Sequence, residues 1–193
     1  MKNKRIKSAY VMLLVLSFIT YSFGQKNKKI ANIPFDSITQ KYTYVKLIDA
    51  KNKSEKQLYK TAKEWTKTKF SDEKYLIDNE NIQLTDLGSF SFVYQYKQFP
   101  IPYTIIYNLN FLFKNEKYKL EITNIKLSQN SQGTTAEYTL EAFKQYNESF
   151  KIGKNTIEKM LFEIMTEIDL NLLKVISEIE SAMINESKTN TDW

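Results

Sequence analysis

The 193-residue chain contains no cysteine and no histidine, and its only arginine is Arg5. It therefore lacks a thiolate nucleophile, the side chain that most often acts as a general base near neutral pH, and the commonest metal ligand. The absence of cysteine also excludes disulfide bonds and a cysteine-linked lipid anchor. We expect a fold held by its apolar core, no metal, no cofactor and no enzymatic activity.

Glycine and proline are also scarce, with 4 and 3 residues, whereas 42% of the chain is hydrophobic and 14% is aromatic. This composition excludes a collagen-like or disordered chain and supplies enough apolar material for one buried core. After residue 24, no apolar run approaches the roughly 20 residues that span a bilayer. We expect one globular domain, with no transmembrane span once the leader described next is removed.

The N-terminus has the pattern of a secretory signal peptide. Basic residues within 2–7 precede an apolar stretch of about fifteen residues that ends in small residues before a polar run. We expect a signal peptide over 1–24, cleavage between Gly24 and Gln25, a basic linker over 25–32, and export to the periplasm or the medium. The alternative is an uncleaved membrane anchor, for which the apolar stretch is short.

Removing the leader changes the charge of the protein. It takes away four of the 28 Lys and Arg residues, which leaves 24 lysines against 22 acidic residues and lowers the net charge from +6 to +2. A nearly neutral, exported domain without arginine lacks the electrostatic footprint of nucleic-acid-binding proteins. We therefore expect no nucleic-acid partner.

The first half of the mature chain predicts a strand, a helix and then further strands. Aromatic and β-branched residues favour a strand over 41–48. Ser54 and Gln57 form a capping box for a helix that extends to about Phe70 and presents Leu58 and Trp65 on its apolar face.

Four strands are predicted next, with no helix between them. In chain order they cover residues 81–84, 89–99, 104–114 and 117–127. A turn over 86–88 separates the first two, and Pro100 and Pro102 close the second. The apolar alternation changes phase near 123–124, which predicts a β-bulge.

The C-terminal part is expected to be a loop with a short irregular or helical segment over 129–153, an amphipathic helix over 154–186 and a disordered tail over 187–193. The apolar stripe of the long helix favours packing on the sheet of its own chain over a coiled-coil seam. The resulting order, β-α-β-β-β-β-α, predicts an α+β fold: an antiparallel sheet with helices on one face, followed by a long C-terminal helix.

Three stretches carry a family resemblance: IPFD at 33–36, QLYKTAKEW at 57–65 and KNEKYKLEITN at 114–124. With the order of elements, they resemble a family of exported bacterial proteins catalogued as a domain of unknown function with a TBP-like (TATA-binding-protein-like) fold. The resemblance covers about residues 33–128 and implies a TBP-like domain there and an exported location. Because the family has no assigned activity, the resemblance implies no mechanism, and fold alone does not carry function.

A sheet with helices on one side leaves its other side open, and tyrosine suits an exposed recognition surface. We therefore predict a binding face for a glycan or an envelope protein. It is made of Tyr42, Tyr44, Tyr94, Tyr96, Tyr103 and Tyr107. The alternative is that these residues belong to the core, because Tyr94 and Tyr96 share the phase of Phe90 and Phe92.

Charged residues are interpreted as solvated. The closely spaced acid pairs are Glu163 with Glu167, Glu137 with Glu141, and Asp78 with Glu80. A carboxylate-bridged metal site would also need histidine, and a calcium loop would need more acids. The lysines of the 54–70 helix, with Lys51 and Lys53, are interpreted as a solvent-exposed surface. The alternative is that these lysines are attracted to acidic lipid head groups.

Together these features predict an exported, non-catalytic binding or interaction module of the periplasm or cell envelope. One alternative is an enzyme, such as a hydrolase, that uses carboxylates and tyrosine in a concave pocket. Another is a structural envelope component that pairs through its C-terminal helix.

Overall fold

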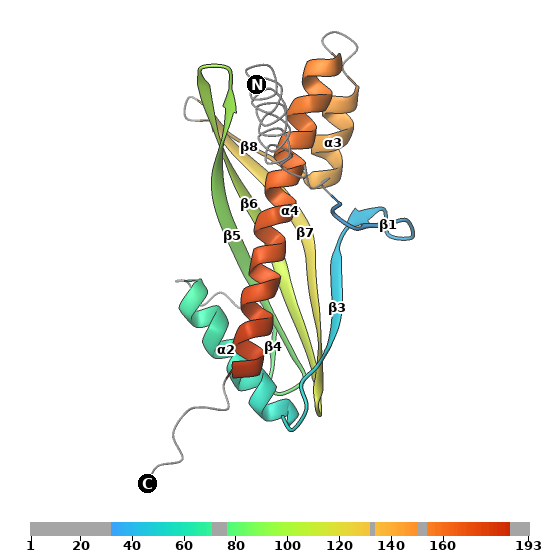
Figure 1. Ribbon diagram of the computed structural model, residues 1–193, viewed down its shortest axis with the longest axis vertical. Coiled ribbons are helices and arrows are strands. Elements are labelled where there is room, and N and C mark those ends of the chain that lie inside the picture. Colours follow the sequence, from blue (N-terminus) through green and yellow to red (C-terminus); the bar gives the residue numbers. More distant parts are fainter. Residues whose placement is uncertain (1–31, 71–76, 132–133, 150–153, 186–193) are drawn as a thin grey trace, which may run out of the picture. The chain divides into compact units, whose positions relative to one another are not determined.

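Figure 1 shows the computed structural model, which describes residues 32–70, 77–131, 134–149 and 154–185. The chain divides into two units, Met1–Ile30 and Ala31–Trp193, and the fold below is that of the second. The expected signal peptide, most of the expected linker and the expected C-terminal tail lie outside the described residues.

A six-stranded antiparallel sheet forms the centre of the fold, with the order β3-β7-β6-β5-β4, and β8 is added beside β7. Its strands are β3 (Tyr44–Asp49), β4 (Ile77–Asn79), β5 (Gln83–Tyr96), β6 (Phe99–Lys114), β7 (Lys117–Ser131) and β8 (Thr134–Thr139). A separate two-stranded ribbon precedes them, made of β1 (Phe35–Asp36) and β2 (Lys41–Tyr42). β3 pairs with the first part of β7 and β8 with its last part.

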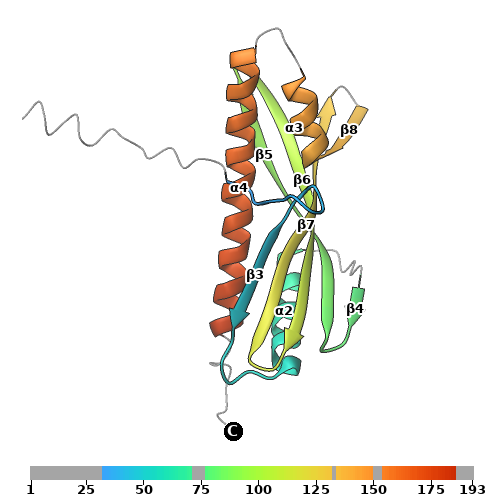
Figure 2. The same ribbon diagram turned by 90° about the vertical axis from the view of Figure 1, so that its right-hand side faces the viewer.

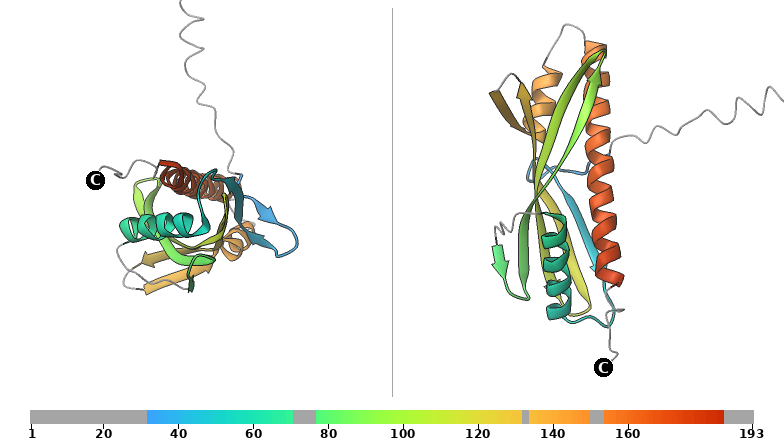
Figure 3. Two further views of the ribbon diagram at one scale, coloured as in Figure 1. Left: turned by 90° about the horizontal axis from the view of Figure 1, so that it is seen from below. Right: turned by 90° about the vertical axis from the view of Figure 1, so that its left-hand side faces the viewer.

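Helices cover one face of this sheet, as predicted (Figures 2 and 3). Within the described ranges they are α2 (Glu55–Lys69), α3 (Leu140–Glu148) and α4 (Lys154–Asn185). The odd-numbered residues of β6 from Tyr103 to Phe113 are buried beneath them, and the intervening residues lie on the other face. The α+β class, the antiparallel sheet and the long C-terminal helix are therefore confirmed.

The apolar stripe of α4 packs on the core of its own chain. Ile164, Ile168 and Leu172 are fully buried there, and Ile179 and Met183 continue the stripe at spacings of three or four residues. A pairing of this helix with another chain would need that stripe, which the sheet already covers. In the described part of the chain, no helix has the length and hydrophobicity needed to cross a membrane.

Two local features predicted from the sequence, the cap of α2 and the bulge in β7, are confirmed. Ser54 caps α2: its side chain accepts a hydrogen bond from Gln57 N–H, and the Gln57 side chain reaches back to the Ser54 backbone. The phase change in β7 is a bulge: Ile106 pairs with Lys126 but Asn108 pairs with Thr123, and Asn124 has a φ of 50°.

The turn predicted over 86–88 is wrong, because β5 runs straight through it. The chain instead reverses between β4 and β5, where Asn81 adopts a φ of 62°. Gly88 sits in the middle of β5, opposite Tyr107 of β6, and the tyrosine ring lies over it. The glycine does not form a turn, because its lack of a side chain provides space for the neighbouring Tyr107 ring.

Pro100 and Pro102 do not end a strand, which is a second correction. They pair with Gln95 and Val93 inside the β5–β6 hairpin. Phe113 N–H donates to the carbonyl of Ile82, the residue just before β5. Backbone N–H groups alternate in direction along an antiparallel ladder, so the nitrogen atoms at even positions of β6 point away from β5. The opposite edge of β6 pairs with β7 only from Tyr103 onward. Because Pro100 and Pro102 precede that pairing, their missing N–H groups interrupt no hydrogen bond of the sheet.

The loop expected over 129–153 is replaced in part by regular structure. Residues 129–131 at the end of β7 pair with residues 134–136 of β8, and Thr139 then caps α3 through a hydrogen bond from Ala142 N–H. The polar residues of this hairpin obscured it, since they lack the apolar alternation of the central strands. The helical part of the expectation is confirmed by α3.

Asp86 is a buried carboxyl group that lies on the helix-covered face of β5, beneath α2. Burial raises its pKa above the ordinary value of 3.8, and hydrogen bonds from Leu87 N–H and the Thr66 hydroxyl partly offset this effect. Because the pKa is higher in the folded than in the unfolded chain, ionisation of Asp86 makes the folded state less stable as the pH rises through this range.

Replacing Asp86 by asparagine should remove this pH-dependent loss while keeping an oxygen that accepts from Leu87 N–H. We expect Asp86→Asn to gain stability relative to the native protein as the pH rises from about 3 to about 7. Urea unfolding midpoints at the two pH values measure the effect. An equal difference at both pH values would contradict a raised pKa.

Candidate functional site

The six tyrosines predicted to form an open binding face do not form one. Tyr42, Tyr44, Tyr103 and Tyr107 are buried in the core, and Tyr107 is only 1% exposed. Tyr94 and Tyr96 are half-buried at the edge, in phase with Phe90 and Phe92. These strand positions face the helices, so the interpretation as core residues is the correct one for this set.

Four of the six carboxylates in the acid pairs form an ion pair or a hydrogen bond with another element. Lys63 contacts Asp78 at 2.7 Å and Lys126 contacts Glu137 at 2.7 Å, while Glu141 accepts from Tyr42 N–H and Glu163 accepts from the Tyr94 hydroxyl. Among the described residues, no group of three or more acids is placed to hold a metal ion. These four carboxylates therefore hold neighbouring elements together.

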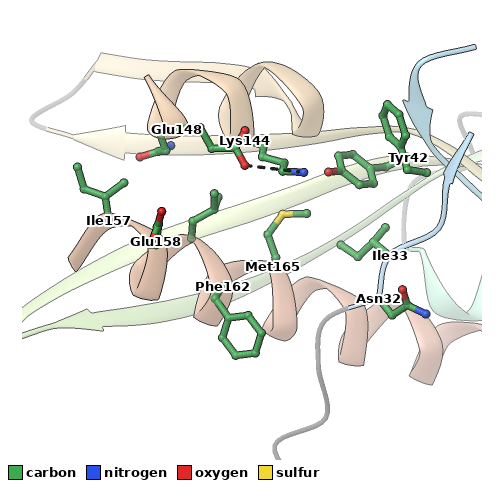
Figure 4. A pocket seen from close by; sticks show the side chains of 12 residues that line it. Asn32, Ile33, Tyr42, Lys144, Glu148, Ile157, Glu158, Phe162 and Met165 are labelled. Atoms are coloured by element: carbon green, nitrogen blue, oxygen red, sulfur yellow. Dashed lines mark ion pairs between the residues drawn. The ribbon is translucent and has the colours of Figure 1, made fainter. Parts of the chain in front are cut away.

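A pocket of about 620 Å³ lies elsewhere, between α3, the first part of α4 and the strap, by which we mean residues 32–42 with β1 and β2 (Figure 4). It combines apolar walls with a few polar groups. Its apolar lining is Ile33, Phe35, Tyr42, Ile157, Leu161, Phe162 and Met165, and its polar lining is Asn32, Lys144, Asn147, Glu148 and Glu158. Such a combination of volume and lining is typical of sites for small ligands.

The strap is fixed to both helices by hydrogen bonds. The buried carboxylate of Asp169 on α4 accepts from the Tyr44 hydroxyl at 2.5 Å and from Asn32 N–H at 3.2 Å. Glu141 on α3 accepts from Tyr42 N–H at 2.7 Å. The pocket wall is therefore held in place from two sides, and burial together with the Asp169 carboxylate raises the pKa of Tyr44.

Lys144 is the one cationic group that lines the pocket in the described residues. Its ammonium lies 3.8 Å from the Glu148 carboxylate and 5.8 Å from the centre of the Tyr42 ring. A hydrogen bond with the Tyr42 hydroxyl raises the pKa of Lys144, burial lowers it, and Glu148 adds a smaller upward contribution. Lys144 is therefore held protonated at neutral pH, suited to donating hydrogen bonds and unsuited to acting as a base.

Sequence reasoning did not find this pocket. The strap lies about a hundred residues before α3 along the chain, and no spacing rule connects them. The sequence signals for it were the apolar pair Ile33 and Phe35, which lie outside any long strand, and the amphipathic helix α4, which contributes Ile157 to the lining.

Comparison with known proteins gives a family match for the central part of the chain. Residues 44–128 match the family model of a domain of unknown function (DUF4468) with TBP-like fold. This agrees with the resemblance seen in the sequence, although the match begins at β3 and leaves the strap outside. A search of curated proteins gave no significant match.

Two solved structures share the fold. A DUF4468 family protein from Bacteroides ovatus aligns with a TM-score of 0.61 and 14% identity over 78% of this chain and 90% of its own. A TBP-like protein from Parabacteroides distasonis aligns with the same TM-score and identity over 79% of this chain and 97% of its own. At this identity the likeness establishes the TBP-like fold.

Proposed function

We propose that this protein is an exported, non-catalytic binding module of the periplasm or cell envelope, and that its pocket takes a small amphiphile. The pocket carries the proposal: it measures about 620 Å³, is walled by Ile33, Leu161 and Met165, and is bordered by a strap that partly buried hydrogen bonds hold. That volume lies within the range of about 300–1,000 Å³ that small-molecule sites occupy.

The chemistry of the lining suggests the form of the ligand. An apolar body would lie against the walls, because burying apolar surface is the main favourable term there. A polar or anionic end would be held by the protonated Lys144, next to the side chain of Asn147. A protonated lysine serves binding in this way, which supports a non-catalytic role.

Export rests on the N-terminal pattern: basic residues, an apolar stretch and small residues before Gln25. In that compartment an envelope protein could present the apolar group in place of a free amphiphile. We do not propose a glycan that stacks on the six tyrosines, because four of these residues are buried.

An enzyme remains the second candidate, since two carboxylates, Glu148 and Glu158, line the same pocket. A hydrolase would need one of them for proton transfer. Turnover of esters or glycosides that is lost in Glu158→Gln would establish this candidate and overturn ours. A Glu158→Gln protein that still binds, with no turnover by the native protein, is the result we expect.

The pocket is tested with anilinonaphthalene sulfonate, a fluorescent probe with an apolar body and one anionic group. We expect the chain from Gln25 onward to bind it at one site. Ile157→Trp should fill part of the pocket and weaken probe binding by about tenfold or more, which corresponds to about 1.4 kcal/mol. Lys144→Gln should weaken it through loss of the cation.

Matched controls for both variants lie on α4, outside the pocket lining. Ile184 is an exposed isoleucine at the other end of α4, and Lys174 is an exposed lysine there. Ile184→Trp and Lys174→Gln should bind the probe as the native protein does. If Ile157→Trp binds as tightly as Ile184→Trp, the pocket is not the binding site.

A further inference from the structure

The sheet face opposite the helices carries a second feature, which we call the basic apolar patch. It consists of Val45, Leu47, Leu112, Lys114, Lys117 and Lys119. Leu47 is 71% exposed, Val45 55% and Leu112 36%. Part of the patch is a hollow of about 300 Å³ whose lining includes Leu47, Leu112 and the three lysines. Large exposed aliphatic side chains in contact with a cluster of charges need an explanation.

Strand register sets the order of the patch. Lys119 of β7 lies between Leu47 of β3 and Leu112 of β6, in one row across the sheet. In the next row, at the β6–β7 turn, Lys114 and Lys117 stand directly opposite each other. Like charges in such a cross-strand pair destabilise a sheet. This arrangement therefore costs stability unless an anion compensates it.

The chain itself compensates only part of this charge. Lys119 pairs with Glu121 at 2.6 Å, and Asp49 stands opposite Lys117 in the register. Within the described ranges, neither Lys114 nor Lys117 forms an ion pair. Hydrogen bonds between the 50–53 loop and Glu116 also bring the exposed Lys51 to this end of the sheet.

We propose that the basic apolar patch docks the protein on an anionic phospholipid surface. Lysines near such a surface are attracted to its head groups, and exposed leucines between them can enter the boundary with the acyl chains. A soluble anion would compensate Lys114 and Lys117 but would leave the row of aliphatic side chains in water. The surface lies on the face opposite the pocket, so the two sites can act independently.

Vesicle flotation tests the docking. The chain from Gln25 onward is mixed with vesicles of phosphatidylcholine alone, or of phosphatidylcholine with an equal part of phosphatidylglycerol. We expect binding to the anionic vesicles only, and release in high salt, because screening weakens the attraction. No binding to anionic vesicles at low salt overturns the proposal. Competition by soluble glycerol phosphate would assign a small-anion site and would also overturn it.

Paired variants locate the contact. Lys114→Glu with Lys117→Glu should weaken binding about tenfold or more, whereas Lys97→Glu with Lys174→Glu changes the net charge equally and should leave most of the binding. Leu47→Asp should weaken it similarly. Val93 is 62% exposed on the same face at the far end of the sheet, so Val93→Asp is its control. Equal losses in test and control variants would show binding by net charge alone and overturn the assignment.

Discussion

Replacing Gly88 by valine should leave little folded protein. A Cβ atom at this position would lie 2.4 Å from Cε2 of Tyr107 and 2.7 Å from its hydroxyl oxygen. The ring is 1% exposed and packs beside Phe90, so it has no free space to move into. Overpacking by a methylene costs about 1–3 kcal/mol, and valine adds three carbons. We expect a loss of at least about 3 kcal/mol, a large part of a typical stability of about 5–15 kcal/mol. Urea unfolding and soluble yield measure it.

Two controls separate this overlap from other effects. Ser89→Val changes the next residue, which is exposed on the open face, and should change stability by about 0.5 kcal/mol or less. Gly88→Ala should cost about 1–3 kcal/mol in the native chain and clearly less in a Tyr107→Leu background, because leucine vacates the space over Gly88. Equal costs in the two backgrounds would mean that Tyr107 does not constrain Gly88.

Gly88 also shows which features of the fold could be predicted from sequence. The Ser54 capping box, the stripe of α4 and the bulge in β7 were predictable, because each depends on residues within a few positions of one another. The roles of Gly88 and Pro102 depend on neighbouring strands. Tyr107 of β6 lies over Gly88, and Pro102 is tolerated because β7 does not pair with β6 at that position. Their local chemistry favours turns, and only the register corrects that prediction.

The pocket was less predictable than the fold, for the same reason. Its wall is formed by Ile33 and Tyr42 on the strap, Lys144 on α3 and Leu161 on α4, which meet only in the tertiary structure. The tyrosines were misassigned because alternation gives the two faces of a strand but does not say which face the helices cover. Asp169 was hidden among the polar residues of an amphipathic helix, yet it is buried and connects three segments.

Removing the Asp169 carboxylate should have the second large effect. Asp169→Ala leaves the Tyr44 hydroxyl and Asn32 N–H without their acceptor in buried or partly buried positions, at about 1–3 kcal/mol for each orphaned group. Tyr44→Phe leaves a buried carboxylate with one partner fewer, and hydrogen bonds to charged groups contribute about 1.5–3 kcal/mol. Because Asn32 lines the pocket, both variants should also weaken binding of the fluorescent probe. Urea unfolding and probe titration measure the two effects.

A double-mutant cycle decides whether the effect comes from this contact. If the Tyr44 hydroxyl and Asp169 stabilise each other, the combined variant Tyr44→Phe with Asp169→Ala loses less than the sum of the single variants, by about 1 kcal/mol or more. Replacing both partners by apolar groups is milder than orphaning one, so Tyr44→Phe with Asp169→Leu should be more stable than Asp169→Ala, although Asn32 N–H lacks its acceptor in both. Glu167→Ala, an exposed acid on the same helix, should leave both stability and probe binding almost unchanged. Strictly additive losses at residues 44 and 169 would mean that the Tyr44 hydroxyl and Asp169 do not stabilise each other, and the strap would then depend on the bonds of Asn32 to Asp169 and of Tyr42 to Glu141.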